Sequence, residues 1–116
     1  MQVPLYVDAC MKELLSVIKC GSTAYLMQQS MFLSPIKAVE FLNEHRVNTL
    51  CWVASALTII SGLGAFEDIK PQYMRTVCFG SEVFPVKQLQ LWQSACPGAR
   101  FINLYGPTEA TGMSFY

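Results

Sequence analysis

The sequence predicts an α/β fold with a mainly parallel sheet and flanking helices. Short β-prone runs alternate with stretches of helical periodicity, and the connections between them are only a few residues long. The chain has 116 residues, which is enough for one domain with a core of its own. We therefore expect residues 1–116 to form a single α/β unit with right-handed crossovers.

The first predicted elements are a strand and a helix. Val3–Val7 is a short apolar run compatible with a strand. Asp8 is placed to cap the helix that follows, and Gly21 is placed to end it. The apolar residues of this helix recur at the spacing of one buried face; they are Met11, Leu14, Leu15 and Ile18.

The next stretch predicts two strands with a helix between them. Thr23–Gln28 is β-prone and is expected to be a strand. Ser34 followed by Pro35 is typical of a helix start, with Ser34 as the N-cap, and the periodicity continues to about Arg46. Val47–Val53 then predicts a further strand.

The second half of the chain continues the alternation. Ser55–Leu63 predicts a helix that stops at the glycines, and Met74–Phe79 predicts a strand. Pro85 opens another helix, which Pro97 and the glycine after it terminate. A last strand is expected at Phe101–Leu104. The apolar face of the Pro85 helix includes Val86, Leu89, Trp92 and Ala95.

Composition excludes some partners. Lys plus Arg equals Asp plus Glu, eight of each, so there is no electrostatic case for nucleic acid or an anionic membrane. Charged residues make up 14% of the chain and apolar residues 53%, whereas about 25% charge is usual. We expect part of the surface to be covered normally by more chain, and self-association of these residues alone would be unsurprising.

Cysteine usage points to a reducing compartment. The five cysteines are an odd number and are far apart in the sequence, which favours small buried thiols in the cytosol over a disulfide framework or a zinc site. The single histidine, His45, lies near the end of a predicted helix, where interaction with the helix dipole is the expected role. The cysteines are Cys10, Cys20, Cys51, Cys78 and Cys96.

One uncharged run has the length of a membrane span. Val47–Phe66 contains no charged residue, and about 20 apolar residues suffice to cross a bilayer. The run also holds several polar residues and glycines, and no basic cluster flanks it. A buried strand followed by a buried helix explains it without lipid, so we expect no membrane partner.

Polar groups follow several predicted strands. They are Asp8, the Gly80-Ser81-Glu82 turn, and the Asn103–Thr111 segment, while Trp52–Leu57 could supply a wall. The carboxyl ends of parallel strands meet at one edge of a sheet, and ligands of open α/β sheets bind outside that edge. We therefore expect these groups to converge.

The residue types in the last segment suit an anionic, partly aromatic ligand. Glu109 is a hard oxygen donor of the kind that Mg²⁺ accepts beside phosphates. Thr108 can donate to a phosphate oxygen, Tyr105 offers a face to a flat heterocycle, and Asn103 both donates and accepts. Structural roles stay open for the same residues. Glu109 would then be a solvated carboxylate, Tyr105 a core aromatic and Asn103 a turn-stabilising amide, while Asp8 would be a helix N-cap.

Several catalytic motifs are absent from these 116 residues. There is no Gly-rich phosphate loop of either common type, no H-E-x-x-H and no G-x-S-x-G nucleophile elbow. No residue has the sequence neighbours of an activated nucleophile. The catalytic apparatus within this sequence is therefore incomplete.

The motifs resemble those of the adenylate-forming (AMP-binding) ligase superfamily over nearly the whole chain. The resemblance is strongest to the amino-acid adenylation domains of nonribosomal peptide synthetases and to D-alanine–carrier protein ligases. Val7-Asp8-Ala9-Cys10 matches the Phe-Asp-x-Ser segment of that family. Phe79-Gly80-Ser81-Glu82 resembles its Gly-Gly-Glu loop, and Asn103-Leu104-Tyr105-Gly106-Pro107-Thr108-Glu109 resembles its adenylate-binding motif.

The resemblance implies a reaction and its cofactors. Such enzymes activate an amino acid with ATP and Mg²⁺ as an aminoacyl adenylate. The acyl group then passes to a phosphopantetheine thiol on a carrier protein. Attack of a carboxylate at the α-phosphorus needs alignment and charge neutralisation more than a protein nucleophile.

The resemblance also implies roles for individual residues. Asp8 would pair with the substrate ammonium, and Glu109 would hold Mg²⁺. In the adenylate-binding motif, Asn103 would bond the exocyclic amine of adenine and Thr108 would reach the α-phosphate. The remaining expected contacts to substrate or nucleotide involve Gly80, Ser81, Glu82, Leu104, Tyr105 (stacked on adenine) and Gly106.

Departures from the family pattern concern the acyl substrate. Ser81 replaces the second glycine of the usual Gly-Gly-Glu, Cys10 stands where Ser or Thr is common, and Ala56 stands where proline is frequent. The pyrophosphate-binding loop, the ribose-binding aspartate and the C-terminal lysine of the family are not in this sequence. We expect the chain to be a middle portion of the large N-terminal domain, inactive by itself.

Two other functions stay open on sequence grounds. An acyl-CoA or aryl-acid ligase of the same superfamily is one, and Asp8 argues against it because it favours an ammonium-bearing substrate. The other is a non-catalytic nucleotide-binding or interaction module that keeps the adenylate motif without the machinery around it.

Overall fold

The protein is built on a parallel sheet with helices on both sides, as the sequence predicts. The structure, a computed structural model, describes residues 9–110 and 112–116. Its sheet has three strands in the order β1-β2-β3. They are β1 (Thr49–Val53), β2 (Thr76–Gly80) and β3 (Arg100–Leu104). The predicted strand at Val3–Val7 lies outside the described residues, apart from which the fold class is confirmed.

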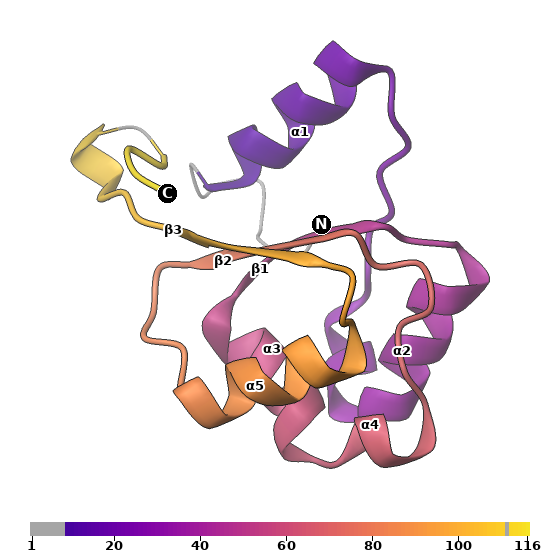
Figure 1. Cartoon of the computed structure of the whole chain (residues 1–116). Coiled ribbons are helices and arrows are strands. Elements are labelled where there is room, and N and C mark those ends of the chain that lie inside the picture. Colours follow the sequence, from indigo (N-terminus) through magenta and orange to yellow (C-terminus); the bar gives the residue numbers. More distant parts are fainter. Residues whose placement is uncertain (1–8, 111) are drawn as a thin grey trace.

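Four helices lie on one side of the sheet and one lies on the other (Figure 1). On the first side are α2 (Pro35–Glu44), α3 (Ala54–Gly62), α4 (Ala65–Asp68) and α5 (Val86–Ala95). Helix α1 (Ala9–Cys20) crosses the opposite face. Two short 3₁₀ turns complete the chain, η1 (Gln29–Leu33) and η2 (Thr108–Ala110). The turns η1 and η2 and helix α4 were not predicted.

The face beneath the four helices carries the core. Alternate strand residues point to it, and Leu50, Trp52 and Val77 are buried there. Trp92 of α5 is fully buried, and its Nε1–H donates to the Leu57 carbonyl oxygen at 2.9 Å. This bond satisfies the indole and ties α5 to α3, so the largest core side chain leaves no polar group unpaired.

The apolar residues of α1 are not buried in the structure, contrary to the prediction. Met11 and Leu15 are about half exposed, and Ile18 is 75% exposed. The helix itself forms where expected and ends at Cys20, directly before Gly21, which has φ +59°. Helical periodicity fixes which residues share a face, but burial requires something packed against that face. Asp8, the predicted cap, lies outside the described residues.

The prediction of a strand at Thr23–Gln28 is wrong. The segment has no regular secondary structure and pairs with none of the described strands. It is held by side chains instead: the Tyr25 ring stacks on His45 with centroids 4.6 Å apart and meets Phe41 edge-on. β-propensity describes how a side chain fits a pleated surface and does not provide the neighbouring strand.

Helix α2 begins as predicted at Pro35 with Ser34 as its N-cap residue, although the serine side chain does not cap it. Ser34 has φ −129° and ψ 84°, and its side chain makes no capping hydrogen bond. The helix ends at Glu44, and Arg46, which the periodicity had included, lies beyond it with φ +50°. His45 is the C-cap residue, in line with the expected position at a helix end.

The remaining predictions concern cysteines and membrane spans. All five cysteines are free, and Cys20 is exposed, so the expectation that every cysteine is buried is wrong for that residue. Val47–Phe66 folds into β1, α3 and the start of α4. Within the described ranges, no helix has the length and apolarity needed to span a bilayer.

Candidate functional site

The candidate site lies at the edge of the sheet where all the strands end. The register pairs Val53 of β1 with Gly80 of β2, and Gly80 with Leu104 of β3. The segments that leave these three residues therefore start side by side. The predicted convergence is confirmed for the starts of the Trp52–Leu57 wall, the Gly80 turn and the Asn103–Thr111 segment, whereas Asp8 and Thr111 lie outside the described residues.

Gly80 allows β2 and β3 to approach closely at this edge. A Cβ atom built at Gly80 would collide with the Leu104 carbonyl oxygen. The position is also buried. A side chain here would separate the two strands that carry the predicted substrate-binding and nucleotide-binding segments.

The two residues after Gly80 have different structural roles. Ser81 has φ +69°, in the left-handed region that glycine adopts without strain. Glu82 reaches across to the next element: the Ser55 N–H donates to Glu82 Oε2 at 2.7 Å. Helix α3 has no side-chain cap at Val53, so the carboxylate from the β2 turn supplies it and interacts favourably with the helix dipole.

The adenylate-like motif folds back on itself. Tyr105 forms an antiparallel bridge with Phe115, in which the Tyr105 N–H donates to the Phe115 carbonyl oxygen at 2.9 Å. A Cβ atom at Gly106 would collide with the Gly112 carbonyl oxygen. The glycine of the motif is thus required to close the loop, while the Tyr105 side chain remains 65% exposed.

The polar residues of the motif do not all face the same way. Asn103 is the register partner of Phe79 and points to the face that α5 covers, whereas Leu104 points to the face beneath α1. Glu109 is exposed on η2. The side chain of Thr108 lies outside the described part of the structure, as do Asp8 and Thr111.

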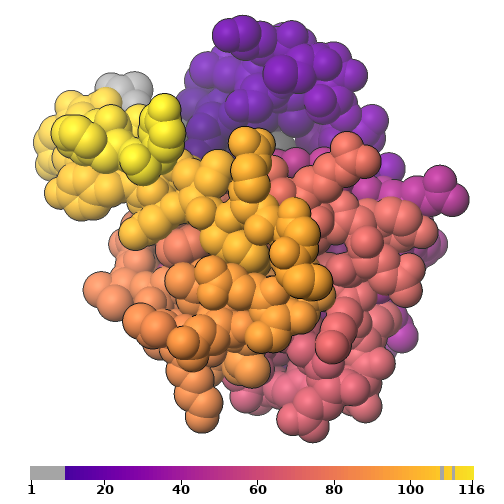
Figure 2. All heavy atoms as spheres, in the orientation of Figure 1, coloured from indigo at the N-terminus to yellow at the C-terminus, as the bar shows by residue number. Residues whose placement is uncertain are grey.

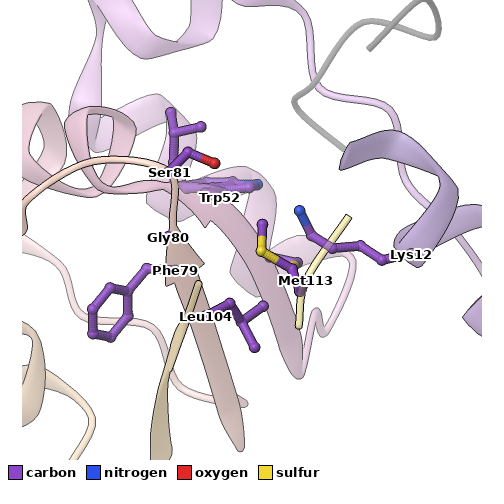
Figure 3. A pocket seen from close by; sticks show the side chains of 9 residues that line it. Lys12, Trp52, Phe79, Gly80, Ser81, Leu104 and Met113 are labelled. Carbon is purple, nitrogen blue, oxygen red and sulfur yellow. The ribbon is translucent and has the colours of Figure 1, made fainter. Parts of the chain in front are cut away.

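A small hollow opens beneath α1 at this edge of the sheet. It is shallow, with a volume of about 10 Å³ available to the centre of a water-sized molecule. In Figure 2, α1 (indigo) forms a ridge above the body of the molecule, and the C-terminal segment (yellow) lies beside it. Figure 3 shows the Lys12 side chain reaching from α1 toward Trp52 and Met113, with Ser81 on the far side. The lining residues are Lys12, Cys51, Trp52, Val53, Phe79, Gly80, Ser81, Leu104 and Met113.

Two thiols meet on the sheet face below α1. Cys51 and Cys78 are register partners, and the Cys51 thiol donates a hydrogen bond to the Cys78 sulfur. This bond lowers the pKa of Cys78 to about 7 against the opposing effect of burial, and Lys12 and Arg100 act in the same direction as the bond. The same bond and burial raise the pKa of Cys51 well above its usual range. Cys78 is therefore the first of the pair to ionise.

Helix α1 also carries an acidic side chain that is partly buried, that of Glu13. Oε2 of Glu13 is buried and makes no hydrogen bond within the described residues. Burial raises the pKa of Glu13, which favours the neutral carboxyl. Glu13 does not line the hollow.

The oxygen ligands at this site suit a metal ion that binds together with a phosphate-bearing ligand. The described residues hold no cluster of three His, Cys, Asp or Glu side chains able to bind a metal. Glu109 is a single exposed carboxylate, which fits Mg²⁺ held mainly by phosphate oxygens and water. The arrangement can orient an anionic ligand between the turns after β2 and β3.

Sequence reasoning missed three residues that shape this site. Lys12 and Met113 line the hollow, and Phe115 pairs with Tyr105. Lys12 lies one helical turn after Asp8, so its position could have been inferred from the helix prediction. Nothing in the local sequence indicates that the segment after Gly112 turns back along Tyr105.

Comparison with known proteins places this architecture in a family. The model of the AMP-binding enzyme family matches residues 1–116, the whole chain. The L-proline–[L-prolyl-carrier protein] ligases of Pseudomonas fluorescens and Streptomyces coelicolor are both 29% identical, over 91% and 90% of this chain. Surfactin synthase subunit 1 of Bacillus subtilis is 25% identical over 91% of the chain.

Solved structures show the same fold. CmiS6 superposes with a TM-score of 0.79 at 25% identity, covering 93% of this chain and 26% of that structure. IdnL7 superposes with a TM-score of 0.84 at 24% identity, covering 94% and 22%. The chain spans only about a fifth of the length of the proline ligases, 21% and 20%.

The family match covers every residue on which the sequence resemblance rested. It covers the turn after β2, the Asn103–Glu109 motif after β3, and the region of Asp8. The parallel sheet and its flanking helices agree with the solved neighbours. The chain belongs to the AMP-binding enzyme family.

Proposed function

We propose that these residues form part of a ligase that activates an amino acid as its acyl adenylate and transfers it to a carrier-protein thiol. The observation that carries the proposal is the meeting of the Gly80 turn and the Asn103–Glu109 motif at the carboxyl edge of a parallel sheet. Membership of the AMP-binding family and similarity to carrier-protein ligases support it.

The reaction requires no protein nucleophile. The substrate carboxylate attacks the α-phosphorus of ATP, an acyl–phosphate bond forms, and the bond to the bridging oxygen of pyrophosphate breaks. Charge builds on the phosphate oxygens during this step, so aligned donors and a divalent cation lower its barrier. Mg²⁺ supplies the positive charge when bound, and Glu109 is the carboxylate we assign to it.

The exposed Tyr105 and its neighbours are assigned to the nucleotide. We assign the Tyr105 ring to stacking on adenine, Asn103 to the exocyclic amine, and Thr108 to the α-phosphate. The backbone of Gly80, Ser81 and Glu82, with Leu104 and Gly106, would line the space between nucleotide and acyl group. Asp8 is assigned to the substrate ammonium. The carrier protein and its phosphopantetheine belong to the same proposal, as does a cytosolic location.

The test is amino-acid-dependent ATP–pyrophosphate exchange by the complete enzyme whose reading frame contains these residues. We expect exchange with at least one amino acid, and a loss of about 100-fold or more in Glu109→Ala, because removing a charge-stabilising group costs this much in comparable sites. Tyr105→Ala should raise the KM for ATP more than it lowers kcat.

Two controls separate this function from its alternatives. Exchange with fatty or aryl acids and none with amino acids would identify an acyl-CoA or aryl-acid ligase instead. Complete absence of exchange, together with saturable binding of an aminoacyl-adenylate analogue in calorimetry, would identify a nucleotide-binding module. The 116 residues alone are expected to give no exchange, and measurable exchange would contradict that expectation.

A further inference from the structure

We propose that Cys51 and Cys78 are an oxidative modification site, at which a hydroperoxide converts the two thiols into a reversible disulfide. The two cysteines lie on neighbouring strands, β1 and β2, on the sheet face that α1 crosses (Figure 1). The site depends on the pairing of these strands and on no bound ligand, so it goes beyond the proposed function and does not require it.

The backbone holds the two cysteines at a distance that a disulfide can bridge. Cys51 and Cys78 are register partners in the parallel pair of β1 and β2. Neighbouring strands lie about 4.8 Å apart in a sheet, and the Cα atoms of a disulfide are usually about 4.4–6.8 Å apart. The sulfurs already interact, since the Cys51 thiol donates a hydrogen bond to the Cys78 sulfur. Oxidation therefore requires no change in the fold.

The groups around Cys78 make it the sulfur that reacts first. The hydrogen bond from Cys51 lowers the pKa of Cys78 to about 7, and the cations Lys12 on α1 and Arg100 on β3 act in the same direction, against burial. A thiolate is the species that attacks an oxidant, and a thiol with this pKa is about half ionised near pH 7. Cys78 is also only half-buried, so a small oxidant can reach it.

Cys51 is suited to the second step, in which a protonated thiol is consumed. Its hydrogen bond to Cys78 and its burial raise its pKa, and Glu13 on α1 adds to this effect while Lys12 opposes it. Cys51 therefore keeps its proton at neutral pH and remains beside the sulfur that the oxidant attacks.

The reaction with hydrogen peroxide has two steps. The Cys78 thiolate attacks one peroxide oxygen, the O–O bond breaks, hydroxide leaves, and Cys78 becomes a sulfenic acid. The Cys51 sulfur then displaces the hydroxyl group from Cys78, an S–S bond forms, and the Cys51 proton leaves with that hydroxyl as water. The two sulfurs lose two electrons in total, and the peroxide gains them.

The disulfide would be easy to reduce. The Cβ atoms of a disulfide lie about 3.8 Å apart, so strands about 4.8 Å apart must approach each other for the bond to form. Strain of this kind makes a disulfide more oxidising and typical of reversible modification. The bond would form two residues before Val53 and Gly80, the register partners at the edge of the candidate site.

The other described cysteines lack this arrangement. Cys10 and Cys20 belong to α1, and Cys96 is the C-cap residue of α5, so none of them is held in register with a second cysteine. Burial raises the pKa of Cys96 to about 11, which keeps it protonated. Oxidation is therefore expected to select the strand pair.

The experiment treats the complete protein that contains these residues with hydrogen peroxide at neutral pH. Remaining thiols are blocked with N-ethylmaleimide during denaturation, and peptides are mapped by mass spectrometry without reduction. We expect a cross-linked product that joins the Cys51 and Cys78 peptides and is two hydrogen atoms lighter than their sum. Dithiothreitol should restore both thiols. Recovery of both cysteines as blocked thiols would overturn the proposal, as would a cross-link from Cys78 to Cys10.

Three serine variants identify the role of each sulfur. Cys51→Ser keeps a hydrogen-bond donor but removes the second sulfur, so the cross-link should disappear and dimedone should capture Cys78 as a sulfenic acid. In Cys78→Ser, Cys51 should remain a thiol. Cys20→Ser removes the exposed cysteine at the end of α1 and should leave the yield of the cross-link unchanged.

The mapping of the unsubstituted protein decides the matter even if a variant folds poorly. Oxidation of its Cys78 to the sulfinic acid while Cys51 remains a thiol would show that the two sulfurs do not meet, and would overturn the proposal. A disulfide in a protein without ATP–pyrophosphate exchange would support the modification site and contradict only the proposed function.

Discussion

The two faces of the sheet are covered in different ways. Beneath α2, α3 and α5, the side chains form a closed core in which Leu57, Val77 and Trp92 are fully buried. Beneath α1, the thiols of Cys51 and Cys78 remain half-buried, and the hollow opens at the strand ends. The same strands form both faces, because successive side chains along a strand point to opposite sides of the sheet.

The difference separates the part that holds the fold from the part available for chemistry. The core face satisfies its polar groups internally: Trp92 bonds Leu57, and the Ser61 hydroxyl donates to Gln88 Oε1 at 2.7 Å. Within the described residues, the α1 face keeps a carboxyl oxygen of Glu13 without a hydrogen-bond partner and the hydrogen-bonded thiols of Cys51 and Cys78. Groups left in this state are typical of binding sites rather than cores.

Truncation of the largest core side chain should show the contrast most strongly. Trp92→Ala should lower the free energy of unfolding by about 3–5 kcal/mol, because it creates a cavity and leaves the Leu57 carbonyl without its donor. Leu15→Ala on the exposed face of α1 should change it by about 0.5 kcal/mol or less. Urea unfolding of the chain measures both values, and equal losses would show that the two faces are not different.

The second prediction concerns the boundary between β2 and β3. Gly80→Ala should cost about 1–3 kcal/mol, because the new methyl group collides with the Leu104 carbonyl. Gly98→Ala is the matched control, since its Cβ would meet no atom within 4 Å, and it should be neutral or slightly stabilising. Urea unfolding again provides the measurement. A neutral Gly80→Ala would mean that the strand ends are free to separate.

The third prediction tests whether Glu82 supports α3. Glu82→Ala should lower the free energy of unfolding by about 1 kcal/mol, the usual value of a helix N-cap, because the Ser55 N–H loses its acceptor. Glu109→Ala removes an exposed carboxylate on η2 and should have an effect of about 0.5 kcal/mol or less. If the two variants unfold at the same urea concentration, the cap contributes nothing measurable.

Replacing Ser81 should have a smaller effect on stability, and of opposite sign. Ser81→Gly should raise the free energy of unfolding by about 0.5–1 kcal/mol, because glycine adopts a φ of +69° without a Cβ clash. The gain is partly offset by the greater freedom of glycine in the unfolded chain. A loss of stability, seen as a lower thermal midpoint, would show that the Ser81 hydroxyl makes a compensating contact.

The last prediction concerns the thiols and has the smallest effect on stability. Cys78 should react with iodoacetamide with a half-maximal rate near pH 7, and Cys51 should react only at much higher pH. Because the pKa of Cys78 falls on folding from 9.0 to about 7, its stabilising contribution is complete above about pH 9 and is lost as the pH falls through 7.

Replacing Cys51, the hydrogen-bond donor, provides the control for the alkylation measurement. In Cys51→Ala, the Cys78 thiolate loses its hydrogen bond, and the midpoint of its alkylation should rise above that of the unmodified chain. Mass spectrometry of alkylated peptides distinguishes the two positions. An unchanged midpoint in Cys51→Ala would assign the lowered pKa of Cys78 to Lys12 and Arg100 alone.

The local sequence was sufficient to predict most of the helices and strands and the sheet edge at which the site lies. The alternation of strand and helix predicted β1, β2 and β3 and the helices α1, α2, α3 and α5, because periodicity and the turn residues after each element are local properties. A parallel sheet then requires its strand ends to meet at one edge. The Gly80 turn and the Asn103 segment were placed together on this basis alone.

Tertiary structure decided what each of these residues touches. Thr23–Gln28 has the composition of a strand but packs through Tyr25 on His45, since strand formation needs a partner. Glu82 caps α3 by accepting a hydrogen bond from Ser55, 27 residues earlier in the sequence, and Lys12 reaches a hollow formed by strand ends far from it in the chain. Such contacts depend on which surfaces the fold brings together, and no local pattern records them. The sequence by itself determined the three strands, the four longer helices and the family motif, whereas only the packing of α1 over the sheet decided where the charged and reactive groups meet.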